Sequence, residues 1–368
     1  MSIKWVLILS GIIIGAIALL LGAIALLLGV NGNPPNMGVC VACFIRDSAG
    51  SMGLHHTETV QYLRPEIFGF ILGSFAAALI FKEFQSKAGS APVIRFVLGF
   101  LMMAGCLVFL GCPLRMVLRI GAGDLNAVIG LVGLIIGIGI GSLFIKKGFS
   151  LPRNYRQSSI EGLILPAICI FLFALFLWNS DIFNASVKGP GASHAPVWMS
   201  IIAGLIIGFI IQRTRFCFIG MAKHVFLSRN YNMAFGVIAL TLVVLLGNIY
   251  LGKFNLGFEN QPIAHNDGVW NFLSMALVGL CGVLITGCPL RQLANAGQGN
   301  SDAAVSVVGM LVGAAFAHNF SYASSPAGVT DNGKLVVIIG LLFAVIVATV
   351  YTYAVNKAKD NGISKNDA

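Results

Sequence analysis

The sequence Gly-Cys-Pro-Leu-Arg occurs twice, at residues 111–115 and 287–291, and brings Cys112 and Cys288 to equivalent positions. Proline lacks an amide hydrogen and suits the first position of a helix, so each cysteine is expected at the N-terminal mouth of a short helix. A thiol there feels the partial positive charge of the helix end, which favours thiolate and attracts anions. The motif therefore predicts thiols that can receive a small anion.

A second block also repeats, because Ala-Cys-Phe-Ile at residues 42–45 returns as Phe-Cys-Phe-Ile at residues 216–219. This alignment pairs Cys43 with Cys217. Packing alone would tolerate Ala or Ser at such positions, so the repetition of the same residue favours function. With the first motif, the sequence predicts a substrate path of four thiols in two symmetric pairs.

The other cysteines carry weaker signals. Cys106, Cys169 and Cys281 are interpreted as small buried packing residues. Cys40-x-x-Cys43 resembles a redox or zinc pair, but no second pair exists and no histidine has ligand spacing around it. We therefore expect no metal site and no cofactor, and the sequence leaves open whether Cys40 takes part in the path.

Four arginines lie near the repeated cysteines and are candidates for stabilising an anion. Arg115 and Arg291 follow their cysteines by three residues, about one helical turn, and Arg46 and Arg215 flank the second block. An arginine within the membrane is costly unless it has a role. The alternative for Arg115 and Arg291 is that they extend to lipid headgroups.

Acidic and amide side chains follow the Gly-Cys-Pro-Leu-Arg motifs at equivalent positions. Asp124 corresponds to Asn300, and Asn126 corresponds to Asp302. We expect these residues to cap the helices that follow, with proton coupling by the two acids as the alternative.

The composition is that of a membrane protein. Hydrophobic residues make up 57% of the 368 residues and charged residues only 10%, with a mean hydropathy of +0.90. The 44 glycines suit close packing of helices in lipid. The net charge of +10 suggests nucleic acid at first sight, but no soluble segment mixes basic and aromatic residues, so it is assigned to membrane orientation.

Apolar runs between polar breaks predict ten membrane crossings. They lie at about 5–30, 66–81, 96–110, 124–145, 161–178, 196–212, 233–251, 271–286, 302–320 and 334–355. The first is expected to be a permanent helix, with a cleaved signal peptide as the alternative.

The repeated motifs divide the chain into a first repeat at 1–178, a linker at 179–195, a second repeat at 196–355 and a cytoplasmic tail at 356–368. Five crossings in each repeat force the second copy into the membrane upside down. The predicted fold is an all-α polytopic membrane protein with two inverted repeats, whose short broken helices meet at the midplane. Most of the 23 Lys and Arg residues then fall on the inner side, which places both termini in the cytoplasm.

The paired motifs resemble the YeeE/YedE family of bacterial membrane proteins, which includes thiosulfate uptake transporters. The segments 33–47, 65–67 and 109–116 are similar to a subgroup associated with selenium metabolism. The resemblance covers essentially all ten crossings. It implies an inner-membrane transporter in which thiols pass the anion along by hydrogen bonds to its sulfur. By motif, these thiols are Cys112, Cys217 and Cys288, with Cys43 as their symmetry partner.

Three functions follow from these observations. The first is import of a small inorganic sulfur or selenium anion through a lipid-embedded protein that is not an enzyme, with a cytoplasmic sulfur- or selenium-carrier protein as a candidate partner. The second is a membrane enzyme that exchanges thiols or accepts a sulfur or selenium atom on the same cysteines. The third is a structural or partner-binding membrane protein, which the duplicated polar motifs disfavour. No nucleic acid is expected as a partner.

Overall fold

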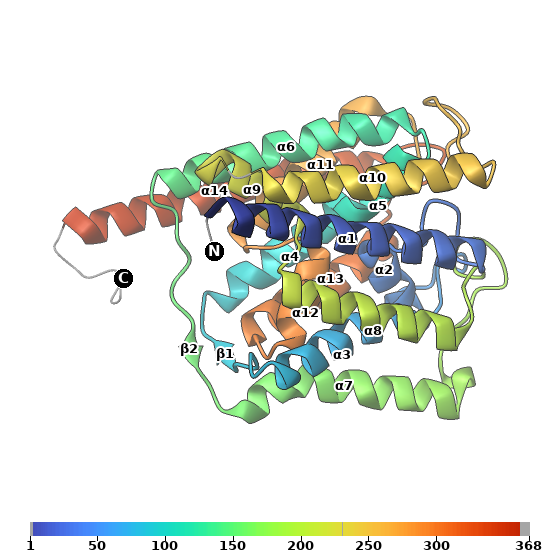
Figure 1. Cartoon of the computed structure of the whole chain (residues 1–368), viewed down its shortest axis with the longest axis horizontal. Helices are drawn as coiled ribbons and strands as arrows, with labels where there is room; N and C mark the ends of the chain where they lie inside the picture. Colours follow the sequence, from blue (N-terminus) through green and yellow to red (C-terminus); the bar gives the residue numbers. More distant parts are fainter. Residues whose placement is uncertain (1–2, 230, 361–368) are drawn as a thin grey trace.

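The computed structural model describes residues 3–229 and 231–360, and the regular structure of this part of the chain is helical with almost no sheet (Figure 1). Its long helices are α1 (Ile3–Val30), α3 (Pro65–Ile80), α4 (Pro92–Phe109), α6 (Leu125–Lys146), α7 (Ser159–Trp178), α8 (Val197–Thr214), α10 (Asn232–Tyr250), α11 (Gly268–Leu284), α13 (Ser301–Asn319) and α14 (Asp331–Asp360). Its short helices are α2 (Val41–Ser51), α5 (Pro113–Gly121), α9 (Phe218–Ser228) and α12 (Pro289–Gly297). A 3-10 turn, η1 (Ser180–Ile182), and an antiparallel pair of strands, β1 (Lys87–Ala88) and β2 (Tyr155–Arg156), complete the described elements.

The ten long helices correspond one to one with the ten predicted crossings. In the described part of the chain, seven stretches are long and apolar enough to span a membrane, and they contain α4, α6, α7, α8, α11, α13 and α14. Shorter apolar segments lie in α1, α3 and α10. The protein is therefore an all-α polytopic membrane protein, as predicted.

The main helix interfaces join the two halves of the chain. Helix α3 packs chiefly against α8 and α1 against α10, while α4 packs against α13 and α6 against α11. Each pairing has a counterpart in which α1–α7 and α8–α14 exchange roles. Neither half could bury its helices without the other, so the fold depends on their association.

Glycines bring the backbones of these paired helices together. A Cβ atom added at Gly69 in α3 would lie only 2.6 Å from the Cα of Gly204 in α8. One added at Gly137 in α6 would lie 2.0 Å from the carbonyl oxygen of Ala276 in α11. Dispersion contacts between close backbones drive helix association in lipid, so these glycines set the interhelical spacing.

The short helices of the two halves lie toward different ends of the bundle (Figure 1). Helix α1 begins, and α14 ends, at the end where β1 and β2 lie. Helices α2 and α5 lie toward the opposite end, whereas α9 lies toward the end at which α1 begins.

The predicted linker at 179–195 contains η1 and runs over the first half, where the backbone N–H of Asn184 donates to the carbonyl of Ser51 at 2.8 Å. Helix α14 continues to Asp360, so the segment predicted as a tail begins as helix. Residues 361–368 of that tail lie outside the described residues.

Candidate functional site

Cys112 and Cys288 stand at the mouths of short helices, as predicted. Each is the N-cap residue of its helix, α5 or α12, and the proline that follows occupies the first helical position. Leu110 and Thr286, two residues earlier, both have φ of 63°, a left-handed conformation that turns the chain out of the preceding long helix. The backbone break that the proline predicted is therefore present in both halves.

The other two short helices also begin with cysteine. Cys40 is the N-cap of α2, and its sulfur accepts the backbone N–H of Cys43 at 3.4 Å. Cys217 is the N-cap of α9, and its sulfur accepts the backbone N–H of Gly220 at 3.3 Å. Four helix mouths in the described structure thus carry a thiol at the same position.

In the structure, the residue equivalent to Cys217 in the first half is Cys40, whereas the alignment of the repeated blocks indicated Cys43. That alignment pairs Cys217 with Cys43, whereas Cys40 is the residue with the same N-cap position and the same hydrogen bond. One signal in the sequence agrees with Cys40, because the interval from Cys40 to Cys112 differs by a single residue from that between Cys217 and Cys288. Cys43 lies inside the first turn of α2.

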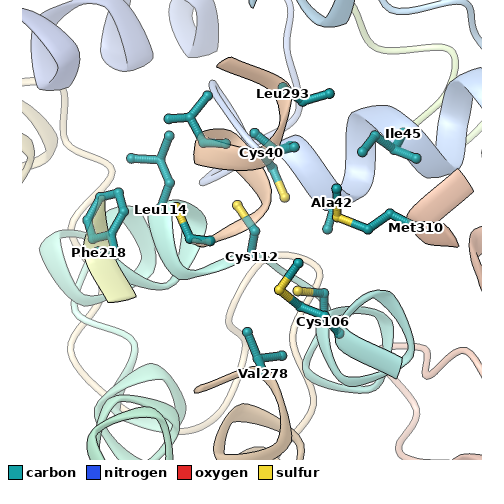
Figure 2. Close-up of a cluster of buried hydrophobic side chains, with 14 of the residues drawn as sticks. Cys40, Ala42, Ile45, Cys106, Cys112, Leu114, Phe218, Val278, Leu293 and Met310 are labelled. Atoms are coloured by element: carbon teal, nitrogen blue, oxygen red, sulfur yellow. The ribbon is translucent and has the colours of Figure 1, made fainter. Parts of the chain in front are cut away.

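Cys40, Cys43 and Cys112 form the thiol cluster of the first half. The thiol of Cys40 donates to the sulfur of Cys43 at 2.9 Å. Figure 2 shows the sulfur atoms of Cys40 and Cys112 directed toward one another. Cys106 of α4 lies nearby in the same view, so a residue interpreted as packing lies beside this cluster.

Cys217 and Cys288 form the thiol pair of the second half. The backbone N–H of Cys288 donates to the sulfur of Cys217 at 3.4 Å. Cys288 lies within electrostatic range of Cys112 in the first half. The two thiol groups thus face the same interior region from different helix mouths.

The thiols are closed off from water in this conformation. Cys40, Cys112, Cys217 and Cys288 are 0%, 1%, 6% and 2% exposed. Apolar side chains of both halves surround the first cluster, among them Phe218 and Leu293 (Figure 2). The four N-cap thiols are therefore shielded from solvent in this conformation.

Arg115 and Arg291 occupy equivalent positions but have different surroundings. Arg115 is fully buried and donates to the carbonyls of Asn36, Leu110 and Ile263 and, at 3.7 Å, to the sulfur of Cys43. Most N–H groups of the Arg115 guanidinium therefore already donate hydrogen bonds, and these bonds hold the segments that contain Asn36, Leu110 and Ile263 around the first thiol cluster.

Arg291 is 8% exposed and, among the described residues, donates only to the carbonyl of Ile211, at 2.9 Å. The other N–H groups of the Arg291 guanidinium have no acceptor among the described residues and lie near Cys217 and Cys288. The alternative that Arg115 and Arg291 extend to lipid headgroups is wrong, because both are buried within the protein.

Arg46 and Arg215 are both paired with carboxylates. Arg46 and Arg64 hold the two carboxylate oxygens of Asp47 at 2.6 and 2.8 Å in a buried triad. Arg215 pairs with Glu83 at 3.1 Å on a more exposed surface. The pairings of Arg64 with Asp47 and of Arg215 with Glu83 could not be predicted from the sequence, because these partners are 17 and 132 residues apart in the chain.

The capping predictions are confirmed at two positions and wrong at two. Asp124 accepts the backbone N–H of Asn126, and Asn300 accepts that of Ala303, so both are N-caps. Asn126 instead donates to the carbonyl of Phe258 at 2.7 Å. Asp302 accepts the backbone N–H groups of residues 89 and 90, so tertiary contacts outweigh local capping at these two sites.

No group of three or more His, Cys, Asp or Glu side chains within the described residues is arranged to hold a metal ion.

Residues 213–365 match the family described as Sulphur transport. This match supports the resemblance to the YeeE/YedE family. The matched region runs from the end of α8 to α14 and contains Cys217, Cys288 and Arg291. The search of curated proteins found no match. The description of the matched family indicates that transport of a sulfur compound is the function of that family.

Proposed function

We propose that this protein imports a small anion of the thiosulfate type, or its selenium counterpart, across the bacterial inner membrane along a path of thiols. The observation that carries the proposal is the pairing of N-cap cysteines, Cys40 with Cys112 and Cys217 with Cys288. The match of residues 213–365 to a sulphur-transport family supports the substrate class. A cytoplasmic sulfur- or selenium-carrier protein would accept the cargo.

The chemistry of the helix mouths fits such a cargo. Thiols donate weak hydrogen bonds to an anion, and the helix ends add partial positive charge without a formal counter-ion. A cage of several free arginines would bind the anion too tightly for conduction, which requires binding weak enough for release. The guanidinium of Arg291 lies near Cys217 and Cys288 and uses one N–H group to bind the carbonyl of Ile211. Its positive charge and its remaining N–H groups would attract the anion toward the second thiol pair.

The path would cross the membrane if the halves are inverted repeats. The reciprocal packing of helices supports this arrangement, as does the position of α2 and α5 toward one end and α9 toward the other. The concentration of basic residues around Lys146 and Lys147 favours a cytoplasmic location for that end and for both termini. The anion would then pass from Cys40 and Cys112 to Cys217 and Cys288.

The test is uptake of radiolabelled thiosulfate into proteoliposomes, with selenite and sulfate as competitors. We expect the double variant Cys112→Ala/Cys288→Ala to lose uptake by at least about tenfold, since removing a donor to a charged group costs about 1.5–3 kcal/mol. Cys169→Ala is the matched control, because Cys169 is a buried cysteine of α7. Undiminished uptake by the double variant would defeat the proposal.

A second function is favoured by the 2.9 Å contact between Cys40 and Cys43 beside Cys112. A thiolate here could attack the sulfane sulfur of thiosulfate, breaking its S–S bond, forming a cysteine persulfide and releasing sulfite. Mass spectrometry after exposure to thiosulfate separates the two functions. A persulfide on one of these cysteines without transmembrane flux would favour the enzyme.

A further inference from the structure

A cavity of about 280 Å³ opens beside the second thiol pair, at the end of the molecule that carries Lys146 and Lys147. It lies between the start of α4, the loop after α6 and the end of α11. Its polar lining includes Ser90, Arg95, Arg153, Asn154 and Thr286, and none of the described residues that line it is acidic. A water molecule takes about 30 Å³, so the cavity has room for a small oxyanion with part of its hydration shell.

Arg95 is the partly buried cation of this cavity. Its guanidinium donates to the carbonyl of Ser90 at 2.7 Å, to the hydroxyl of Ser90 at 3.0 Å and to the carbonyl of Ile285 at 3.4 Å. Asp302 acts on Arg95 electrostatically, but its oxygens accept backbone N–H groups of residues 89 and 90. Two of the five guanidinium N–H groups therefore remain for a ligand, and the fixed positive charge is not neutralised by an ion pair within the described residues.

Thr286 contributes an exposed hydroxyl in a strained conformation. Its φ of 63° is unfavourable for a β-branched side chain. The equivalent residue in the first half, Leu110, has the same φ but is buried, at 4% exposure. The hydroxyl of Thr286 donates to the carbonyl of Ile285 at 2.7 Å and can rotate toward a ligand.

The position of Thr286 connects the cavity to the thiols. Only Gly287 separates it from Cys288, the N-cap of α12. An anion that leaves Cys288 toward this end would meet the hydroxyl of Thr286 first and Arg95 next. The cavity contains no thiol, so it can recognise only the charge and oxygen atoms of a ligand.

We propose that Arg95, Arg153 and Thr286 form a binding site for a small divalent oxyanion at the inner mouth of the path. The proposal deepens the proposed function and rests on it for the direction of movement. Guanidinium groups and a hydroxyl bind sulfate-like oxygens regardless of a terminal sulfur. The site therefore accepts thiosulfate and sulfate alike, whereas the thiols select the soft sulfur atom.

The test is equilibrium binding of radiolabelled thiosulfate and sulfate to the full chain in lipid nanodiscs. We expect Arg95→Gln and Thr286→Val each to weaken the binding of both anions by about tenfold, and Arg95→Lys to restore part of it. Lys147→Gln is the matched control, because this cation lies in the same region but does not line the cavity. Wild-type affinity in Arg95→Gln would overturn the proposal, and if that variant does not fold, wild-type affinity in Thr286→Val would do so.

Thr286→Gly separates a binding role from a structural one. Glycine relieves the left-handed strain, so the melting temperature should rise while anion affinity falls. A higher melting temperature with unchanged affinity would contradict the binding role of Thr286.

Failure of this proposal can be told apart from failure of the transport function. Binding should persist in Cys112→Ala/Cys288→Ala, and its loss there would overturn the separate oxyanion site while leaving the thiol path intact. Absence of thiosulfate flux in the wild type, together with binding that depends on Arg95, would defeat only the transport function.

Discussion

A cysteine at a helix N-cap has two roles that can be separated experimentally. The sulfur of Cys40 accepts the N–H of Cys43 and so completes the first turn of α2, while its side chain also faces Cys112. Serine would serve the first role, since its hydroxyl is a preferred N-cap. Serine would not supply the soft sulfur that the proposed path requires.

We therefore expect Cys40→Ser to fold with wild-type thermal stability but to take up thiosulfate about tenfold more slowly, as for one lost donor to a charged group. Cys43→Ser should have a smaller effect on uptake, because Cys43 lies within the helix rather than at its mouth. Cys169→Ser is the control. Equal loss in Cys40→Ser and Cys43→Ser would show that the N-cap position is not what matters.

Arg115 and Arg291 should behave differently despite their equivalent positions. Arg115→Ala removes the donor to several buried carbonyls, so the free energy of unfolding should fall by about 3 kcal/mol or more. Arg291→Ala removes one hydrogen bond and should cost only about 1 kcal/mol, yet slow uptake by about tenfold. Reversible unfolding in detergent and uptake in proteoliposomes measure the two effects. The reverse ranking of the two variants in stability would contradict this assignment.

At the scale of the helix, the sequence predicts what depends on local rules. The proline after Cys112 and Cys288 fixes where α5 and α12 begin, and apolar length fixes the ten long helices. The start of α2 follows no such rule, because no proline marks it. Cys40 and Cys43 each have a neighbourhood that resembles that of Cys217, and the N-cap position of Cys40 in the structure decides between them.

Replacement of glycines at helix contacts tests whether these residues set the spacing between packed helices. Gly137→Ala should lower the free energy of unfolding by about 1–3 kcal/mol, because the added methyl group would overlap the backbone of α11 and force α6 away. Gly15→Ala in α1 is the matched control, since a Cβ there meets nothing within 4 Å. That control should be stabilised by about 0.5–1 kcal/mol through helix propensity. Unfolding in detergent that shows equal effects for both variants would mean that the α6–α11 spacing is not set by Gly137.

At the scale of the molecule, buried thiols imply that transport along the proposed path would need movement of one half against the other. The four N-cap cysteines are at most 6% exposed, and the largest interfaces lie between the halves. Small shifts at such interfaces can open one thiol pair while the other stays closed, as in transporters built from inverted repeats. The inversion would make Cys112 reachable from one side of the membrane and Cys288 from the other.

Thiol labelling with a membrane-impermeant reagent tests this arrangement. In variants that keep only Cys112 or only Cys288, we expect thiosulfate to promote labelling of Cys112 from outside and of Cys288 from inside, each with about tenfold preference, as a shift of 1.4 kcal/mol between conformations would give. Lys188→Cys and Lys147→Cys, each in a chain without other cysteines, report the two membrane faces. Lys188 has a 69% exposed side chain in the linker, and Lys147 follows α6. Labelling of Cys112 and Cys288 from the same face would rule out the inverted path, because thiols of upside-down repeats must open toward opposite compartments.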